Sequence, residues 1–118
     1  MTETFVDSIT ADWLSVPDAA ARLGMPLSRV RQLLRDRKLL AARRPDGTVG
    51  IPAAFFDGQA ILKGLSGTLT VLFDAGFGDA EALRWLFTAD DTLRGTPIQA
   101  MTEHRVTEVN RLAQALAL

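Results

Sequence analysis

The sequence predicts a mostly α-helical protein with one short β-hairpin in its first half. Most of the 118 residues lie in segments whose apolar residues recur at helical spacing and whose ends carry capping residues, glycine or proline. The stretch 39–52 instead alternates in polarity and is divided by the turn sequence Pro-Asp-Gly. The length and the 47% hydrophobic content fit a single small globular unit with one core.

The first predicted helix lies within 15–24 and follows an arm, residues 1–11, that is rich in Thr, Ser and acids and is expected to be mobile. Ser15 is the candidate cap, Pro17 falls in the first turn, Asp18 stands three residues after the cap, and Gly24 ends the helix. Its apolar face would consist of Val16, Ala20 and Leu23.

A second helix is predicted over "LSRVRQLLRDR", residues 27–37, after a turn of three residues. At about 100° per residue, its apolar side gathers Val30, Leu33 and Leu34. The opposite side gathers Ser28, Arg31, Gln32 and Arg35, with Arg29 on its flank and Asp36 as its acidic neighbour. This helix therefore presents a long-reaching polar and basic face.

The segment 39–52 is expected to form the hairpin. Its inward positions would be Leu40, Ala42, Val49 and Ile51. Pro45, Asp46 and Gly47 would make the turn, and Pro52 would end the second strand. Arg43 and Arg44 then lie next to the tip.

The second half is predicted to be helical. One or two short helices are expected in 53–65, broken near Gly58, followed by helices in 66–76 with Ser66 as cap, in 79–87 with Asp79 as cap, in 96–101 with Thr96 as cap, and in 105–118. The last of these carries an apolar stripe of Val106, Val109, Leu112, Ala113 and Leu116. The chain thus divides into an arm (1–11), a helix–helix–hairpin unit (12–52) and a C-terminal helical domain packed on it (53–118).

Charge is distributed unevenly along the chain, although the formal net charge is −1. Residues 22–44 hold eight basic residues against Asp36 alone, which gives this block +7, while the segments before and after it carry −4 each. A basic block between acidic flanks favours a polyanionic partner for that block alone. The competing interpretation is a solvated helix face without a partner.

Two short helices joined by a tight turn and followed by a basic hairpin form a winged helix-turn-helix arrangement. A helix of this kind fits the major groove of double-stranded DNA, and a two-stranded wing can follow the backbone or the minor groove. Arginine pairs with guanine edges and with phosphates, Gln32 could bridge an adenine edge, and Ser28 could donate to a phosphate at the helix start. The candidate DNA-binding residues are Ser28, Arg29, Arg31, Gln32, Arg35, Arg43 and Arg44.

The stretch "WLSVPDAAARLGMPLSRVRQLLRDRKLLAARRPDGTVGIPAAFF" resembles the excisionase and MerR-type winged helix-turn-helix pattern. With "ALRWL" and "LRGTPIQAM" added, nearly the whole chain is similar to actinobacterial DNA-binding proteins related to a mycobacterial transcriptional regulator associated with serine/threonine kinase signalling. The second half also resembles the toxin-binding segment of Xre-type antitoxins.

These resemblances imply a transcriptional regulator that binds double-stranded DNA. They also imply kinase control through Thr4, Ser8 and Thr10 in the acidic arm, where added phosphate would weaken binding by the basic face. Two alternatives stay open: an antitoxin-like module whose C-terminal half binds a toxin, and an excisionase-like recombination factor.

Other kinds of site have little support in the sequence. The chain has no cysteine, and His104 is its one histidine, expected between two helices. Asp90 and Asp91 are better explained by a loop with a capping role than by a metal or acid–base site, and "GFGDAE" lacks the spacing of a nucleotide-binding loop. We expect no enzyme activity, cofactor or metal. The acidic start without a long apolar run predicts a cytoplasmic protein without a membrane segment.

Overall fold

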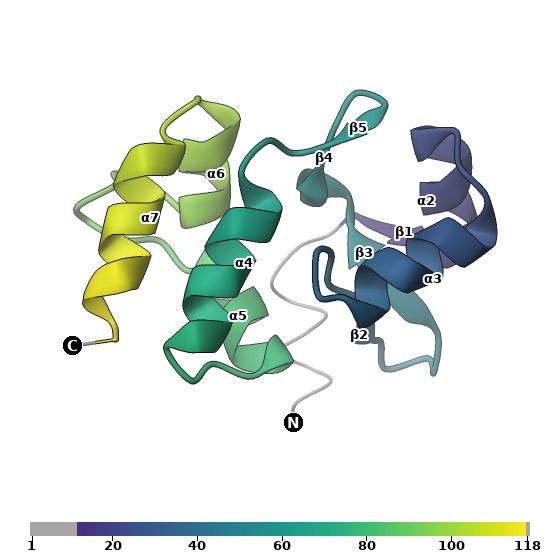
Figure 1. Ribbon diagram of the computed structural model, residues 1–118, viewed down its shortest axis with the longest axis horizontal. Coiled ribbons are helices and arrows are strands. Elements are labelled where there is room, and N and C mark those ends of the chain that lie inside the picture. Colours follow the sequence, from purple (N-terminus) through teal and green to yellow (C-terminus); the bar gives the residue numbers. More distant parts are fainter. Residues whose placement is uncertain (1–11, 118) are drawn as a thin grey trace.

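The computed structural model describes residues 12–117 (Figure 1). In chain order its elements are β1 (Trp13–Ser15), α2 (Val16–Leu23), α3 (Leu27–Arg35), β2 (Ala42–Arg43), β3 (Val49–Pro52), the 3-10 turn η1 (Ala53–Phe55), β4 (Phe56–Asp57), β5 (Ala60–Ile61), α4 (Leu65–Asp74), α5 (Asp79–Leu86), α6 (Pro97–Thr102) and α7 (Val106–Ala115). In this part of the chain no helix is long and apolar enough to cross a bilayer.

The pair α2 and α3 is the predicted helix-turn-helix. Ser15 caps α2, because its Oγ accepts a hydrogen bond from the Asp18 amide at 3.1 Å. Gly24 ends the helix in the left-handed region, with φ of 65°, and its N–H donates to the Ala20 and Ala21 carbonyls. The cap and stop predicted from the sequence are both confirmed.

A three-stranded antiparallel sheet, in the order β1-β3-β2, supports the two helices (Figure 1). The predicted hairpin is its β2–β3 part, whereas the third strand, β1, was not predicted. Trp13 pairs with Pro52, and Ser15 pairs with Gly50. Val49 lies on the predicted face, which it shares with the buried Ile51, but its side chain is 42% exposed because the core does not extend to this end of the hairpin. The inward position predicted for Ala42 is wrong, since Ala42 pairs with Gly50 and lies on the opposite face.

Short helices predicted across Gly58 are also wrong in part. After the single turn η1, the chain forms a two-stranded hairpin in which Phe56 pairs with Ile61 and Asp57 with Ala60. Gly58 has φ of 61°, a turn conformation that glycine adopts without strain. Strands of two residues leave too short an apolar pattern to separate them from a helical turn.

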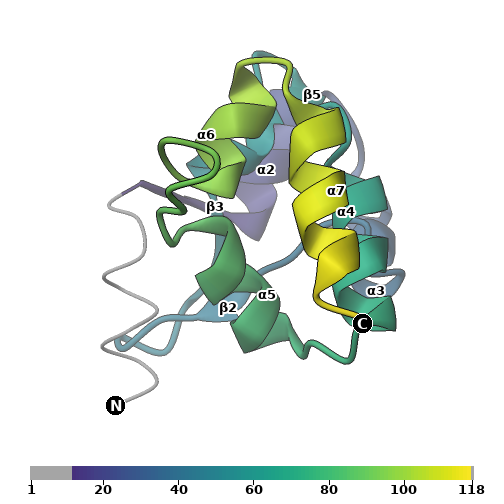
Figure 2. The same ribbon diagram turned by 90° about the vertical axis from the view of Figure 1, so that its left-hand side faces the viewer.

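The four helices of the C-terminal half form a bundle in which α7 packs against α4 and α6 (Figure 2). Two predicted caps were wrong. Helix α4 begins at Leu65 after Gly64, and Ser66 lies in its first turn; α5 has Gly78 as its cap, and the Gly78 N–H donates to Glu81 Oε1 at 2.9 Å. The cap at Thr96 is confirmed, since its Oγ1 accepts from the Gln99 amide.

The apolar stripe of α7 is confirmed in its first turns and wrong at its end. Val109 and Ala113 are fully buried. Leu116 is 42% exposed, because α7 ends at Ala115 and Leu116 lies beyond its last turn.

One hydrophobic core runs through both halves of the described chain. It joins Val30, Leu39 and Ile51 of the first half to buried leucines of α4 and α5. Phe55, fully buried, lies where the halves meet, and its ring centroid is 5.9 Å from that of Phe87. The helix-turn-helix is therefore fixed on the C-terminal helices by packing.

Candidate nucleic-acid interface

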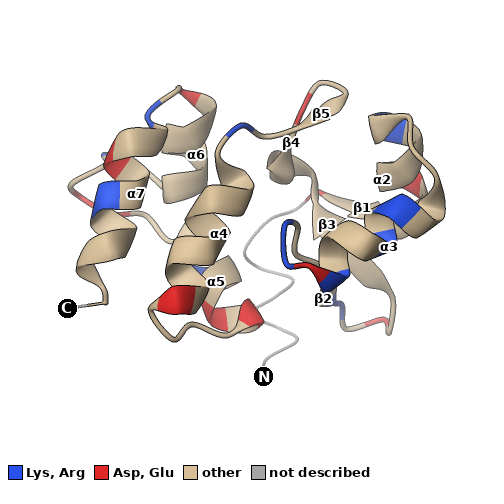
Figure 3. Cartoon of the chain, viewed as in Figure 1, with Lys and Arg blue, Asp and Glu red and all other residues tan. Residues whose placement is uncertain are grey.

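Helix α3 presents the predicted polar face to solvent. Its buried side is anchored by Val30, which is fully buried, with Leu33 and Leu34 half-buried beside it. All five candidates on this helix are exposed: Ser28, Arg29, Arg31, Gln32 and Arg35. Figure 3 shows the basic residues along this helix. The apolar contacts thus set the rotation of α3 and leave the basic face outward.

Two hydrogen bonds connect Gln32, Arg35 and Asp36 on this face, and Arg29 and Arg31 take no part in them. Gln32 Oε1 accepts from the Arg35 guanidinium at 2.7 Å, and Gln32 Nε2 donates to Asp36 Oδ1 at 3.0 Å. Gln32 therefore bridges its neighbours three and four residues away, and it orients Arg35. Within residues 12–117, no acidic side chain forms an ion pair with Arg29 or Arg31.

The two arginines of the wing lie in different surroundings. Arg43 is exposed, whereas Arg44 is half-buried and places Cζ 5.5 Å from the centre of the Trp13 ring. No pattern in the sequence distinguishes these two neighbours. Trp13 lies on β1, and β1 was not predicted.

A compact turn joins β2 to β3. The Arg44 amide donates to the Thr48 carbonyl at 2.7 Å, and Gly47 adopts φ of 88°. Asp46 Oδ1 accepts from both the amide and the hydroxyl of Thr48, at 2.9 and 2.6 Å. These hydrogen bonds lower the pKa of Asp46 below its usual value, and the bond from the Thr48 hydroxyl contributes more than the bond from the Thr48 amide. The wing tip is thereby held in one conformation.

Two arginines of the basic block face the C-terminal half instead. Arg22 Nε donates to the Gly58 carbonyl at 2.7 Å, and its Cζ lies 5.5 Å from the centre of the Phe56 ring. Arg37 forms an ion pair with Asp79 at 2.8 Å and stacks on Phe73 at 4.1 Å. Sequence reasoning counted both in the block without identifying these roles, because their partners are distant in sequence.

Acidic residues gather away from the basic face. Asp74 ends α4, and Asp79 and Glu81 occupy the first turn of α5, on the other half of the molecule (Figure 3). Basic residues therefore predominate on α3 and the wing, whereas these acids lie on α4 and α5, where Asp79 pairs with Arg37. Such a polarity orients a protein toward a polyanion.

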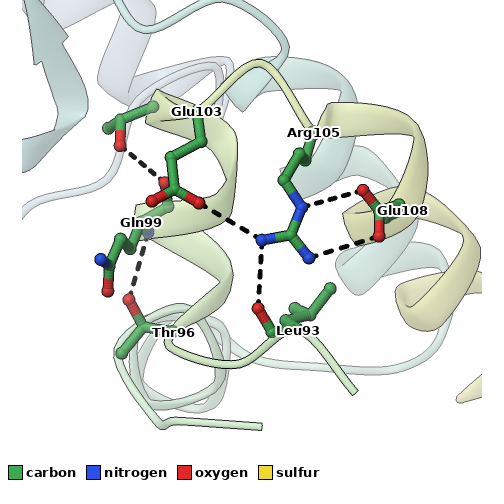
Figure 4. Close-up of polar contacts among 7 residues, drawn as sticks. Leu93, Thr96, Gln99, Glu103, Arg105 and Glu108 are labelled. Atoms are coloured by element: carbon green, nitrogen blue, oxygen red, sulfur yellow. Dashed lines mark hydrogen bonds and ion pairs between the residues drawn. The ribbon is translucent and has the colours of Figure 1, made fainter. Parts of the chain in front are cut away.

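A polar network joins α6, α7 and the loop before α6 (Figure 4). The Arg105 guanidinium donates to both carboxylate oxygens of Glu108, at 2.9 and 3.3 Å, to Glu103 and to the Leu93 carbonyl. The hydrogen bond from Arg105 lowers the pKa of Glu108 and raises that of Arg105. This network connects structural elements and brings no nucleophile and base together.

The remaining polar candidates have structural positions. Asp90 Oδ1 accepts from the Thr92 amide at 2.8 Å, so this side chain stabilises the turn in that loop. His104 is exposed between α6 and α7, as predicted, with φ of 64°. Across residues 12–117 the His, Asp and Glu side chains form no group of three suited to a metal ion. Thr4, Ser8 and Thr10 lie outside the described residues.

Comparison with known proteins extends over both halves. Residues 4–56 match the family model described as DNA-binding protein Rv2175c, wHTH domain, and residues 62–117 match the Rv2175c C-terminal domain of unknown function. The chain is 42% identical over 115 residues to the DNA-binding protein Rv2175c of Mycobacterium tuberculosis, covering 86% of this chain and 78% of that protein.

The fold agrees with a solved structure. The NMR structure of Rv2175c superposes with a TM-score of 0.82 at 39% identity, covering 91% of this chain and 82% of the other. The winged helix-turn-helix followed by a helical C-terminal part is thus confirmed, as is the actinobacterial resemblance. This chain belongs to the Rv2175c family of winged helix-turn-helix proteins.

Proposed function

We propose that this chain binds double-stranded DNA and acts in transcriptional regulation, with α3 in the major groove and the β2–β3 wing beside it. The observation that carries the proposal is the exposed basic face of α3, whose rotation is fixed by Val30 on the opposite side. The similar mycobacterial protein is named a DNA-binding protein. The proposed contact residues are Ser28, Arg29, Arg31, Gln32, Arg35, Arg43 and Arg44.

The local contacts support different roles for Arg31 and Arg35 on α3. Arg31, with no ion-pair partner in the described chain, is available for a guanine edge or a phosphate. Arg35 reaches the groove in an orientation held by Gln32, and Asp36 holds Gln32 in turn. A direct contact from Gln32 to adenine would exchange its hydrogen bond to Asp36 for one to the base.

The test is fluorescence anisotropy of a labelled duplex from the upstream region of the gene, measured at several salt concentrations. Replacing Arg31 or Arg35 by Ala should cost about 1–3 kcal/mol of binding if that residue reads a base, or reduce the salt slope by about one if it neutralises a phosphate. Arg111→Ala is the matched control, because it removes the same charge from an exposed position on α7.

The outcome separates the two interpretations of the basic block. The proposal is supported if affinity falls as the salt concentration rises, is lost in the Arg31→Ala, Arg35→Ala double variant, and is kept in Arg111→Ala. No binding at low salt, or equal losses in all variants, would leave the basic block as a solvated face.

Kinase control is proposed as a second layer of the same function. Phosphate on Thr4, Ser8 or Thr10 would add negative charge to the arm that precedes the DNA-binding unit. The expected result is reduced DNA affinity of the phosphorylated chain in a gel-shift series. Unchanged affinity at full phosphate occupancy would contradict this layer alone.

A protein-binding function of the C-terminal half is the second candidate. It is favoured by a hollow of about 310 Å³ between the loop at Leu93 and helix α7, with Leu112 and Ala115 in its lining. A toxin-like reading frame beside the gene would favour the antitoxin-like alternative, and a neighbouring integrase gene the excisionase-like one.

A further inference from the structure

The wing has two chemically different faces, which follow from the pairing of its strands. Arg43 pairs with Val49, and Ala42 pairs with Gly50. Because directly opposed residues point to the same side of a sheet, Arg43 and Val49 share one face. Ile51, two residues along β3, lies on that same face and is fully buried. The Arg43–Val49 face is therefore an extension of the core side of the sheet.

The opposite face is already occupied by a stacked pair. A Cβ at Gly50 would lie 2.9 Å from Trp13 Cε3 and 3.2 Å from Arg44 Cδ, so both side chains lie over Gly50 on this face. Arg44 also lies over the Trp13 ring. The Arg44 stem thus packs on protein, while Arg43 extends from the other face into solvent.

Val49 stands out among the described residues by its exposure. Val49 and Leu116 are the two large hydrophobic side chains that are strongly exposed in residues 12–117, each at 42%. Because β1 ends opposite Gly50, the sheet at Val49 consists of the β2–β3 hairpin alone. An apolar contact surface consequently lies directly beside a cation, on the wing of a DNA-binding unit.

We propose that the Arg43–Val49 edge of the wing enters the minor groove and selects A·T base pairs there. This inference rests on the proposed DNA binding. A narrow A·T minor groove attracts an inserted arginine by its enhanced negative potential. Guanine adds an amino group to the groove floor, and a valine packed there leaves that donor without an acceptor. Arginine and valine together therefore favour A·T pairs.

The same geometry assigns Arg44 a different role. Its contact with Trp13 places the guanidinium on the face of the wing opposite Arg43, and we assign it to the DNA backbone there. Loss of Arg44 should weaken binding to all sequences alike, whereas loss of Arg43 should also remove the preference for A·T.

The test uses a duplex that the full chain selects from a random-sequence pool, rebuilt with A·T, G·C or inosine·C pairs in the flanks protected by the wing. Inosine lacks the guanine amino group, so inosine·C presents the major-groove pattern of G·C and a minor groove without that donor. We expect A·T and inosine·C duplexes to bind alike and G·C to bind at least about fivefold more weakly.

Val49→Thr is the diagnostic variant. Threonine keeps the β-branched shape that suits the strand, and its hydroxyl can accept a hydrogen bond from the guanine amino group. The A·T-over-G·C ratio should fall toward one in Val49→Thr and in Arg43→Ala, and it should persist in Arg44→Ala. A far-UV spectrum and a melting curve for each variant show that the hairpin is intact.

The outcomes distinguish this inference from the function on which it rests. Equal binding of the three duplexes, a G·C-like result for inosine·C, or an unchanged ratio in Val49→Thr would overturn the minor-groove assignment while DNA binding stands. Failure to bind any duplex at low salt would overturn the proposed function itself.

Discussion

At the residue scale, the arginines of the basic block, residues 22–44, have different roles, and the contacts of each arginine indicate which role it has. Arg29, Arg31 and Arg43 extend into solvent, while Arg22 and Arg37 hold the helix-turn-helix to the C-terminal half. Sequence reasoning could locate the exposed face of α3, because the period of Val30, Leu33 and Leu34 fixes it. It could not identify the internal contacts, because these depend on partners more than thirty residues away.

Arg37→Ala should lower stability and leave the DNA-binding salt slope unchanged. The variant loses stacking on Phe73 and an ion pair with Asp79 that is about half exposed, so the expected loss in unfolding free energy is about 1 kcal/mol. Urea unfolding measures this loss, and Asp79→Asn, which keeps the stacking, should lose less. A salt slope reduced by about one in Arg37→Ala would place Arg37 on DNA instead.

At the scale of the elements, local signals were sufficient for some and insufficient for others. Helix α2 carries its cap, its proline and its stop within ten residues, and all three were predicted. Strand β1 has three residues and forms only because Pro52 and Gly50 return to pair with it. The strands β4 and β5 depend in the same way on each other. The sequence pattern therefore did not show β1, whose partners are distant in sequence, or β4 and β5, whose strands of two residues are too short to carry a pattern.

The wing turn should respond to acid through Asp46. Its lowered pKa means that the carboxylate stabilises the folded turn above the ordinary pKa, and that this contribution disappears as pH falls through the lowered value. Carboxyl NMR should show Asp46 titrating below the usual 3.8, with the Thr48 amide signal moving along the same curve. In Asp46→Asn the Thr48 amide should lack this titration; an Asp46 pKa at or above 3.8 would contradict the turn geometry.

At the scale of the whole molecule, the sequence predicts a division at residue 52, and the core is continuous across it. Phe55 lies in that core, and its ring meets Phe87 of the C-terminal half. We propose that the helix-turn-helix and the C-terminal helices unfold together. The C-terminal half would then set the orientation of α3 through Arg37 as well as by packing.

Cooperative unfolding can be followed with the two tryptophans, one in each half. Trp13→Phe leaves Trp85 as the probe, and Trp85→Phe leaves Trp13. We expect fluorescence and circular dichroism to give coincident transitions within each variant. Phe55→Ala should lower the unfolding free energy by about 3–5 kcal/mol and shift both probes together. Fluorescence and circular dichroism transitions that separate within either tryptophan variant would contradict a single folding unit.

The measurement that tests the central claim most directly is an NMR titration of the full chain with a duplex from the upstream region of its gene. The account predicts the largest amide shifts in residues 28–35 of α3 and 43–49 of the wing, with small shifts along α7. Shifts concentrated on α7 and the loop at Leu93, with α3 unchanged, would contradict DNA recognition by the helix-turn-helix.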